Sequence, residues 1–276
     1  MRRGGWGVLA AAVLVLGGAA PAAAATPEVR PGQLVAWSAP GTERCFVDGA
    51  SFEPIGDTCW FPVDLLTPAG SLEVARRRDG QRETAHVRVG AYPYPEQRLT
   101  VDPGHVDLSP EDAARSARES ARVAELWDLE TERRFTLPLS PPLADLPEGG
   151  RFGARRVFNG EPRSPHTGAD YAAPKGTEVL AVAPGRVVLA ADHFFSGESV
   201  FLDHGDGLIT MYFHLSEIAV AEGSTVEAGE PLGTVGATGR ATGPHLHFGA
   251  RWRGARIDPA VLLAPQRSAR LPAAGR

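Results

Sequence analysis

Five residues in the second half of the chain have side chains suited to holding a metal ion: His166, Asp170, His214, His245 and His247. They supply four imidazoles and one carboxylate, the ligand types of a catalytic zinc site that keeps one coordination position open. The sequence has no His-Glu-x-x-His segment, which in another class of zinc peptidase presents two ligands from one helix. The five residues therefore predict a metal site built on strands and loops.

The spacing of these residues indicates how extended segments would bring them together. His245 and His247 are two positions apart, so on a strand both side chains point to one face while Leu246 points into the core. His166 and Asp170 are four positions apart and also share a face of an extended segment. The prolines and glycines around them argue against a helix. The side chains can thus converge without a helix.

Three motifs, in this order, resemble those of the lysostaphin-type zinc endopeptidases of bacterial cell walls. They are His-x-x-x-Asp at 166–170, Tyr-Phe-His-Leu-Ser at 212–216 and Thr-Gly-Pro-His-Leu-His-Phe at 242–248. The resemblance covers roughly residues 150–264. It implies a mainly antiparallel β catalytic domain with a duplicated, barrel-like hybrid motif. It also implies that His166, Asp170 and His247 bind Zn²⁺.

Two histidines then remain for acid–base chemistry. His245, on the same strand face as a ligand, is expected to take the proton from water activated by the zinc ion. His214 would stabilise the oxyanion or give a proton to the departing amine, and the two roles can be exchanged. Tyr212 shares a face with His214 by strand alternation, which makes it a candidate for substrate contact, although an interior position is the main alternative. We interpret His204, in a predicted hairpin turn, as structural.

Both ends of the sequence carry compositional signals. Residues 1–25 combine Arg2 and Arg3, an apolar run and a small-residue site, as in a cleaved secretory signal peptide. The apolar run is shorter than the roughly 20 residues that span a bilayer, so we expect export to the periplasm or beyond and no stable membrane anchor after cleavage. Residues 265–276 are rich in Ala, Arg and Pro and are expected to form a disordered tail.

Residues 26–100 have the pattern of short strands joined by turns. Alternating residues on both sides of Asp79-Gly80 predict a β-hairpin, and an immunoglobulin-like β domain is expected for the region. We interpret the arginine run at 76–78 as a solvated strand end. Cys45 and Cys59 are the only cysteines, and in an oxidising compartment they are expected to form a disulfide.

Residues 101–148 are expected to be a helical connector followed by a proline-rich linker. Ser109 can cap a helix that has Pro110 at its first position. The alanines at 113, 117, 121 and 124 and Trp127 form a stripe that would lie against a neighbour. The prolines between 138 and 147 mark a boundary, so the catalytic domain is expected to cover residues 149–264.

Together these patterns predict an exported, zinc-dependent endopeptidase that hydrolyses peptide cross-links in peptidoglycan. The alternatives are a non-catalytic relative that binds cell wall or activates another hydrolase, and a carrier or phosphotransfer domain on the same motif. No ligand residue is missing, and the Met-Lys-Met-like turn of a carrier is absent. The net charge of −5 and the lack of a basic patch make nucleic acid a poor partner. We also hypothesise intramolecular inhibition by residues 26–150, with Asp145 or Glu148 approaching the site.

Overall fold

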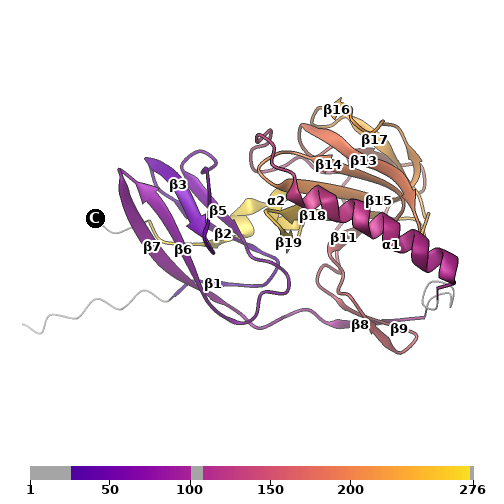
Figure 1. Cartoon of the computed structure of the whole chain (residues 1–276), viewed down its shortest axis with the longest axis horizontal. Coiled ribbons are helices and arrows are strands. Elements are labelled where there is room, and N and C mark those ends of the chain that lie inside the picture. The colour runs from indigo at the N-terminus through magenta and orange to yellow at the C-terminus, as the bar shows by residue number, and fades with distance from the viewer. Residues whose placement is uncertain (1–25, 101–107, 274–276) are drawn as a thin grey trace, which may run out of the picture.

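The computed structural model describes residues 26–100 and 108–273 and shows two β domains in contact (Figure 1). The predicted signal peptide at 1–25 lies outside the described residues. Within them, no helix combines the length and apolar character needed to cross a membrane. The predicted fold class, mainly β with antiparallel pairing, is confirmed.

The N-terminal domain consists of two sheets packed around one core. A five-stranded sheet has the order β1-β7-β6-β3-β4, and a three-stranded sheet has the order β20-β2-β5. The strands are β1 (Glu28–Val29), β2 (Leu34–Ser38), β3 (Thr42–Val47), β4 (Ala50–Phe52), β5 (Thr58–Pro62), β6 (Gly70–Arg78), β7 (Gln81–Val89) and β20 (Ala269–Arg270). Asp79 and Gly80 join β6 to β7 with φ values of 52° and 73°, so the predicted hairpin is confirmed.

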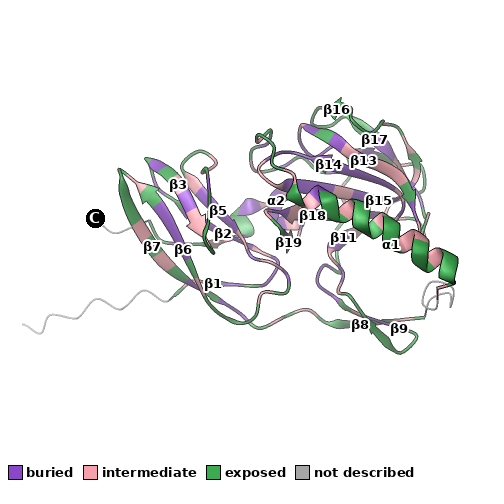
Figure 2. Cartoon of the chain, in the orientation of Figure 1, coloured by how far each residue is buried: buried purple, intermediate pink, exposed green. Residues whose placement is uncertain are grey.

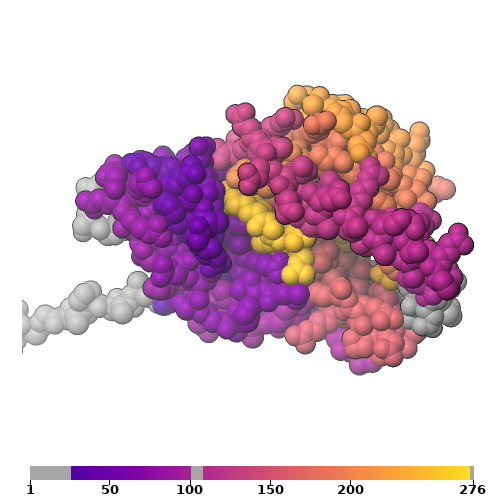
Figure 3. Space-filling model, in the orientation of Figure 1, coloured from indigo at the N-terminus to yellow at the C-terminus, as the bar shows by residue number. Residues whose placement is uncertain are grey.

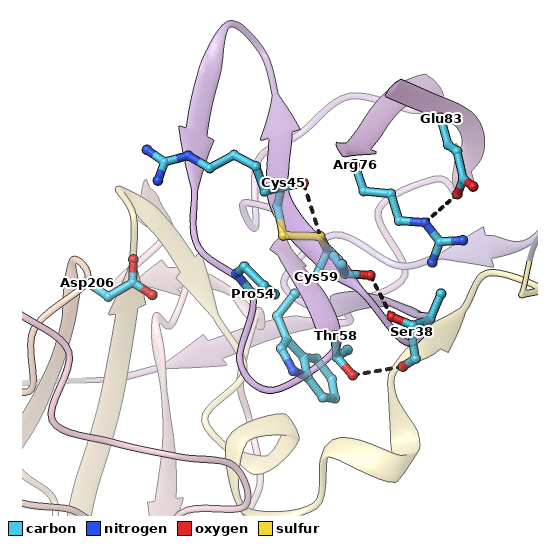
Figure 4. Close-up of a disulfide and its surroundings, with 12 residues drawn as sticks. Ser38, Cys45, Pro54, Thr58, Cys59, Arg76, Glu83 and Asp206 are labelled. Atoms are coloured by element: carbon cyan, nitrogen blue, oxygen red, sulfur yellow. Dashed lines mark hydrogen bonds and ion pairs between the residues drawn. A yellow bond between two sulfur atoms is a disulfide. The ribbon is translucent and has the colours of Figure 1, made fainter. Parts of the chain in front are cut away.

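A disulfide connects the two sheets of this domain. Cys45 on β3 and Cys59 on β5 are bonded, with their Cα atoms 5.6 Å apart, as predicted (Figure 4). Both are fully buried in the cluster that contains Phe61 and Val74. The bond therefore ties the sheets at their shared core.

Arg76 occupies the same interior, which corrects the interpretation of the arginine run as a solvated strand end. Its exposed fraction is 0%. Its guanidinium carbon lies 4.1 Å from the centre of the Trp37 ring, and its Nε donates to Glu83 at 2.6 Å (Figure 4). Strand alternation on β6 turns Arg76 inward and leaves Arg77 exposed. Composition alone could not show which arginine faces the core.

The C-terminal residues complete this domain, so the predicted disorder is wrong for residues 265–273. A 3-10 helix (Pro265–Arg267) leads into β20, which pairs in parallel with β2. Leu271 joins the N-terminal core, and the Trp37 indole donates to the carbonyl of Pro272. Figures 1 and 3 show this segment, in yellow, running between the two domains. The local composition carries no sign of a strand partner more than two hundred residues away.

The C-terminal domain is a nine-stranded antiparallel sheet. Its main path is β11-β18-β15-β14-β13-β16, with β12, β17 and β19 paired alongside. The strands are β11 (Gly168–Tyr171), β12 (Glu178–Leu180), β13 (Gly185–His193), β14 (Gly197–Asp203), β15 (Leu208–Ile218), β16 (Thr225–Val226), β17 (Pro231–Val235), β18 (Leu246–Trp252) and β19 (Ala255–Ile257), followed by the short helix α2 (Ala260–Leu263).

The proline-rich stretch before this sheet is part of its core, which corrects the predicted linker. Phe135, Leu139 and Leu143 have exposed fractions of 4%, 6% and 0% and belong to the main hydrophobic cluster. Backbone N–H groups of Leu139 and Ser140 donate to carbonyls of the domain. The C-terminal domain therefore begins well before residue 149.

Helix α1 (Pro110–Glu125) and a 3-10 turn (Leu126–Asp128) lie across the sheet. Ser109 caps the helix as predicted. The four alanines of the stripe are exposed, so the prediction is wrong for them (Figure 2), whereas Trp127 packs against the sheet. Arg115 donates to the Asp192 carboxylate at 3.0 Å, and Glu119 accepts from the backbone N–H that follows β13 at 2.9 Å. These polar contacts and the apolar packing of Leu126 and Trp127, rather than the alanines, hold the helix on the domain.

A small third sheet joins the two domains near the predicted site. It has the order β10-β9-β8 and consists of β8 (Glu96–Leu99), β9 (Arg155–Phe158) and β10 (Glu161–Arg163). β8 follows the N-terminal domain in the chain. It pairs in parallel with β9, which precedes the first strand of the C-terminal sheet. The chain between the domains is thereby fixed beside residues that enter the site.

Candidate metal and catalytic site

Three predicted ligands converge on one point. His166 Nε2 lies 2.9 Å from His247 Nδ1, and Asp170 Oδ1 lies 3.0 Å from each nitrogen. Zinc–ligand bonds of about 2.0–2.2 Å separate tetrahedral ligand atoms by about 3.3–3.5 Å. The triangle is slightly tighter than that, and its two imidazoles and one carboxylate are a donor set that fits a zinc ion.

Sheet register and a glycine hold these ligands in place. Asp170 on β11 is paired directly with His247 on β18. The Nδ1–H of His166 donates to the Arg151 carbonyl at 2.9 Å, which leaves the Nε2 lone pair facing the other ligands. A Cβ at Gly168 would lie only 2.5 Å from His247 Nε2. Only glycine therefore fits beside this imidazole.

Aromatic stacking adds a further support to the same ring. Phe213 on β15 is paired with His247 across the sheet. Their ring centres are 5.1 Å apart and the planes differ by 2°. The phenyl face limits rotation of the imidazole, so the orientation of Nδ1 toward the other ligands is maintained.

The charge states of the ligands suit metal binding. Burial by itself would raise the pKa of Asp170, but hydrogen bonds and charge interactions with His166 and His247 hold that pKa well below its ordinary value. Burial lowers the pKa of His247 to about 3. The carboxylate is therefore ionised and the imidazole neutral at neutral pH, as metal ligation requires.

His214 reaches the site through a break in strand β15. Its φ is +64°, a left-handed value that is uncommon outside glycine, and the β14–β15 register shifts at this point. Its Nδ1–H donates to the Thr238 carbonyl at 2.8 Å, and its ring centre is 4.8 Å from that of His245. Burial lowers its pKa to about 4, so the ring is neutral.

The same break separates Tyr212 from the site, so its predicted substrate contact is wrong. Tyr212 has an exposed fraction of 0%. Its hydroxyl oxygen accepts hydrogen bonds from the Val182 N–H and the Thr210 hydroxyl, both at 3.2 Å. The bulge at His214 interrupts the alternation on which the prediction depended, and the two side chains face opposite sides of the sheet.

His245 completes the group of five predicted residues. Its Nδ1–H donates to the Gly243 carbonyl at 2.8 Å, and its Nε2 lies 3.8 Å from Asp170 Oδ1. Its side chain is about one-fifth exposed. His204, by contrast, is fully buried between the Pro184 carbonyl and the Thr210 hydroxyl, which confirms its structural interpretation.

Two cavities meet at the ligands. One of about 350 Å³ and one of about 490 Å³ share Arg151, Asp170, Thr242 and His245 in their walls, so the site is open on two sides. Their other lining residues include Gln97, Thr100, Arg156 and Arg240 in the first cavity and Glu148 in the second. Sequence patterns had indicated Glu148 among these. Gln97, Thr100 and Arg156 come from the small third sheet and the residue that follows β8, whose proximity to the site has no local signal.

The arrangement of the site agrees with comparisons with known proteins. The model of peptidase family M23 matches residues 164–259. A crystal structure named as a peptidase M23 from Pseudomonas aeruginosa is 32% identical, with a TM-score of 0.63, over 84% of this chain and 94% of that one. The match therefore includes the N-terminal region as well as the site.

Curated relatives match over a shorter stretch. The DD-carboxypeptidase/endopeptidase Mpg of Neisseria meningitidis is 46% identical over 36% of this chain and 23% of its own length. The peptidoglycan DD-endopeptidase ShyA of Vibrio cholerae is 41% identical over 39% of this chain and 25% of its own. The matched region thus spans about a quarter of these relatives. Because the Pseudomonas aeruginosa structure is 32% identical and is matched over 94% of its length, the chain belongs to peptidase family M23.

Proposed function

We propose that this chain is an exported, zinc-dependent endopeptidase that hydrolyses peptide cross-links in peptidoglycan. The observation that carries the proposal is the convergence of His166, Asp170 and His247 at 2.9–3.0 Å where two cavities meet. An extended peptide can cross such a site and leave residues on both sides of the bond to be cut. The names of the relatives support a cell-wall substrate, which also requires export.

His166 Nε2, Asp170 Oδ1 and His247 Nδ1 would hold the zinc ion. When bound there, zinc would act as a Lewis acid and would make hydroxide available near neutral pH. Two neutral imidazoles and one carboxylate leave part of the charge of the dication uncompensated, which favours this chemistry over purely structural binding. The donor set thus fits a catalytic role.

The two other histidines are placed to act on the attacking water. In each, Nδ1–H donates to a backbone carbonyl, so Nε2 can only accept. We assign proton uptake from the attacking water to His245, because its Nε2 lies 3.8 Å from Asp170 Oδ1 and its partly exposed side chain lines both cavities. The protonated Nε2 can then give its proton to the departing amine.

His214 has a different part in this scheme. It is buried with a pKa lowered to about 4, so a positive charge on this ring is disfavoured. A neutral His214 orients the water through its Nε2 lone pair. This assignment differs from the oxyanion role considered from the sequence, because an Nε2 without a proton cannot donate to an oxyanion.

Digestion of purified peptidoglycan by the zinc-loaded mature chain tests the function. Loss of cross-linked dimers and appearance of monomers in muropeptide analysis is the expected result, and His247→Ala should abolish it. Unchanged cross-linking with full zinc occupancy would overturn the proposal and favour a wall-binding or hydrolase-activating protein.

Inhibition by residues 26–150 stays a prediction. Glu148 lines the second cavity, and Gln97 and Thr100 line the first. A truncation near Gly150 cannot test it, because that change would remove Phe135 and its neighbours from the core. The substitution Glu148→Gln in the full chain is the suitable test, and inhibition predicts faster digestion by this variant.

A further inference from the structure

A further cavity, of about 550 Å³, lies on the other side of the strand that carries Asp170. Ala169 and Tyr171 line it, and strand alternation on β11 turns their side chains to the face opposite that of Asp170. The segment 148–151 forms a wall that this cavity shares with the second cavity at the ligands. Gly150 in this segment exchanges two backbone hydrogen bonds with Asp170, at 3.0 and 3.3 Å. The further cavity therefore adjoins the proposed metal site.

The hydroxyl of Tyr171 is one of three polar groups that line this cavity. Tyr171 is 2% exposed, and its hydroxyl makes no hydrogen bond to another described residue. The ring lies against Gly149, where a Cβ would be only 2.3 Å from Tyr171 Cε1. Because polar groups in such buried positions usually have a hydrogen-bond partner, the cavity offers a position for a polar group of a ligand beside this hydroxyl.

Asp258 and Arg267 bring opposite charges to the same cavity. The Ala260 N–H donates to Asp258 Oδ1 at 3.0 Å, while Oδ2 accepts no hydrogen bond from the described residues. Burial raises the pKa of Asp258, and the hydrogen bond from Ala260 and the positive charge of Arg267 offset this rise only in part. Arg267 is exposed, and no described carboxylate lies within ion-pair distance of it. Both charges are therefore available to a ligand.

The charged lining of the cavity favours a ligand that carries both signs. Burial raises the pKa of Tyr171 to about 12, the charge of Asp258 adds to this rise and the charge of Arg267 opposes it, so the three groups lie within electrostatic range of one another. Glu148 and Arg151 add one further charge of each sign to the wall. A lone cation or anion would meet one unfavourable partner for each favourable one. A zwitterion can satisfy both signs at once.

We propose that this cavity binds the zwitterionic end of an amino acid, and that its ligand is the unlinked end of a diamino acid in the substrate peptide. The inference rests on the proposed function and gives it a subsite beside the metal. A diamino acid joined to the peptide at one end presents an ammonium and a carboxylate on one carbon at the other. Asp258 Oδ2 and the Tyr171 hydroxyl accept from the ammonium, and the forked guanidinium of Arg267 donates to the carboxylate.

Steady-state cleavage of three soluble cross-linked peptides tests the proposal. The first has an unlinked diamino acid end with both charges, the second has the ammonium of that end acetylated, and the third has its carboxylate amidated. With the native enzyme, each modification should raise KM about 10–100-fold, the scale of a charge-assisted hydrogen bond, with little change in kcat. Equal KM values for the three peptides would overturn the subsite, and so would a response to only one of the two modifications.

Two substitutions should separate the recognition of the two charges. Asp258→Asn keeps an oxygen that can accept from Ala260, and it should remove the effect of acetylation while the effect of amidation persists. Arg267→Gln should remove the effect of amidation while the effect of acetylation persists. Arg270→Gln is the matched control, since Arg270 is exposed and does not line the cavity. An unchanged acetylation effect in Asp258→Asn, or an unchanged amidation effect in Arg267→Gln, would refute the assignment.

Tyr171→Phe tests the hydroxyl alone. It should raise the KM of the unmodified peptide about 2–10-fold, the scale of a neutral hydrogen bond, and an unchanged KM would contradict the part given to this hydroxyl. Zinc content and melting temperature should stay at the native values, because the hydroxyl has no partner among the described residues of the unliganded protein. The same two measurements on every variant identify any loss of metal or fold.

A binding measurement separates this inference from the proposed function. If the native enzyme cuts none of the cross-linked peptides, the proposed function fails, and calorimetry with an uncross-linked stem peptide that carries the same diamino acid still tests the subsite in the zinc-loaded protein. Tighter binding of the unmodified stem peptide than of its acetylated form, lost in Asp258→Asn but kept in Arg270→Gln, supports the subsite. Indifference of the native protein to acetylation and amidation refutes it.

Discussion

Asp170 Oδ1 and His247 Nδ1 lie 3.0 Å apart because the two residues face each other in register across β11 and β18. A one-residue slip of either strand would turn one of these side chains to the opposite face. The sheet register, rather than a loop, therefore sets the spacing of two of the three proposed ligands. His166 joins them from the segment just before β11.

Substitution of a proposed zinc ligand should lower the zinc content, whereas substitution of an acid–base histidine should lower the activity alone. His166→Ala, Asp170→Ala and His247→Ala should each leave the purified protein with little zinc, because three ligands are the minimum set. His214→Ala and His245→Ala should keep near-stoichiometric zinc and lose activity by about 10²–10⁴-fold. Metal analysis and peptide cleavage measure both effects. Full zinc in the Asp170 variant would contradict the ligand assignment.

Gly168→Ala should weaken the metal site without touching a ligand. The new Cβ would lie 2.5 Å from His247 Nε2 and 2.6 Å from the Phe248 carbonyl oxygen, so the ring or the strand must move. Changes to residues that orient ligands cost about 10–100-fold in metal affinity. Competition with a zinc chelator measures this. Gly70→Ala is the control, because a Cβ there meets nothing within 4 Å. Equal zinc affinity in the two variants would show that the site tolerates the methyl group.

Loss of the disulfide should lower the stability of the fold and leave the zinc content unchanged. Cys45 and Cys59 are 14 positions apart, and a loop of about 15 residues gives a chain-entropy estimate of about 3 kcal/mol. A Cys45→Ser, Cys59→Ser double variant should therefore unfold at lower denaturant concentration and retain its zinc. Mass spectrometry of the unreduced native chain checks the bond itself, and two free thiols would refute it.

The contact between Asp64 of the N-terminal domain and Arg256 of the C-terminal domain should make the stability of the fold depend on pH. Burial raises the pKa of Asp64, but hydrogen bonds from Arg256 and the Leu66 N–H outweigh it and lower the pKa below its ordinary 3.8. Because its pKa is lower in the folded state, ionised Asp64 stabilises the fold at pH values above about 3.8. This stabilisation is lost as the pH falls through the folded-state pKa. Asp64→Asn should lower the melting temperature at pH 7, with the difference shrinking below pH 3.8. A pH-independent deficit in Asp64→Asn would contradict the ionic origin.

The ordered C-terminus should contribute to stability. Leu271 is buried in the N-terminal core, so Leu271→Ala should cost about 2–5 kcal/mol in the free energy of unfolding. The exposed Arg270→Ala serves as the control. Denaturant titration compares the two. Equal stability of both variants would indicate that β20 does not hold the tail in solution.

Local sequence patterns predicted those features of the structure that depend on the backbone of a few neighbouring residues. The two-residue spacing of His245 and His247 predicts a shared face, and Asp79-Gly80 predicts a hairpin, because both depend on the backbone of a few neighbouring residues. The strands of the C-terminal sheet were predicted from such patterns, whereas the proposed ligand set came from the family resemblance that the ordered motifs carry. The cysteine pair followed from its count and the expected compartment.

Tertiary structure decided what depends on distant partners. The bulge at His214 turns Tyr212 away from the site, and the pairing of β20 with β2 orders a tail that composition alone predicted to be disordered. The burial of Arg76 and the meeting of Arg156 with Arg240 likewise arise from segments far apart in sequence. Strand pairing and side-chain burial are set by the neighbours that folding supplies, and those neighbours leave no periodic signal in the local sequence.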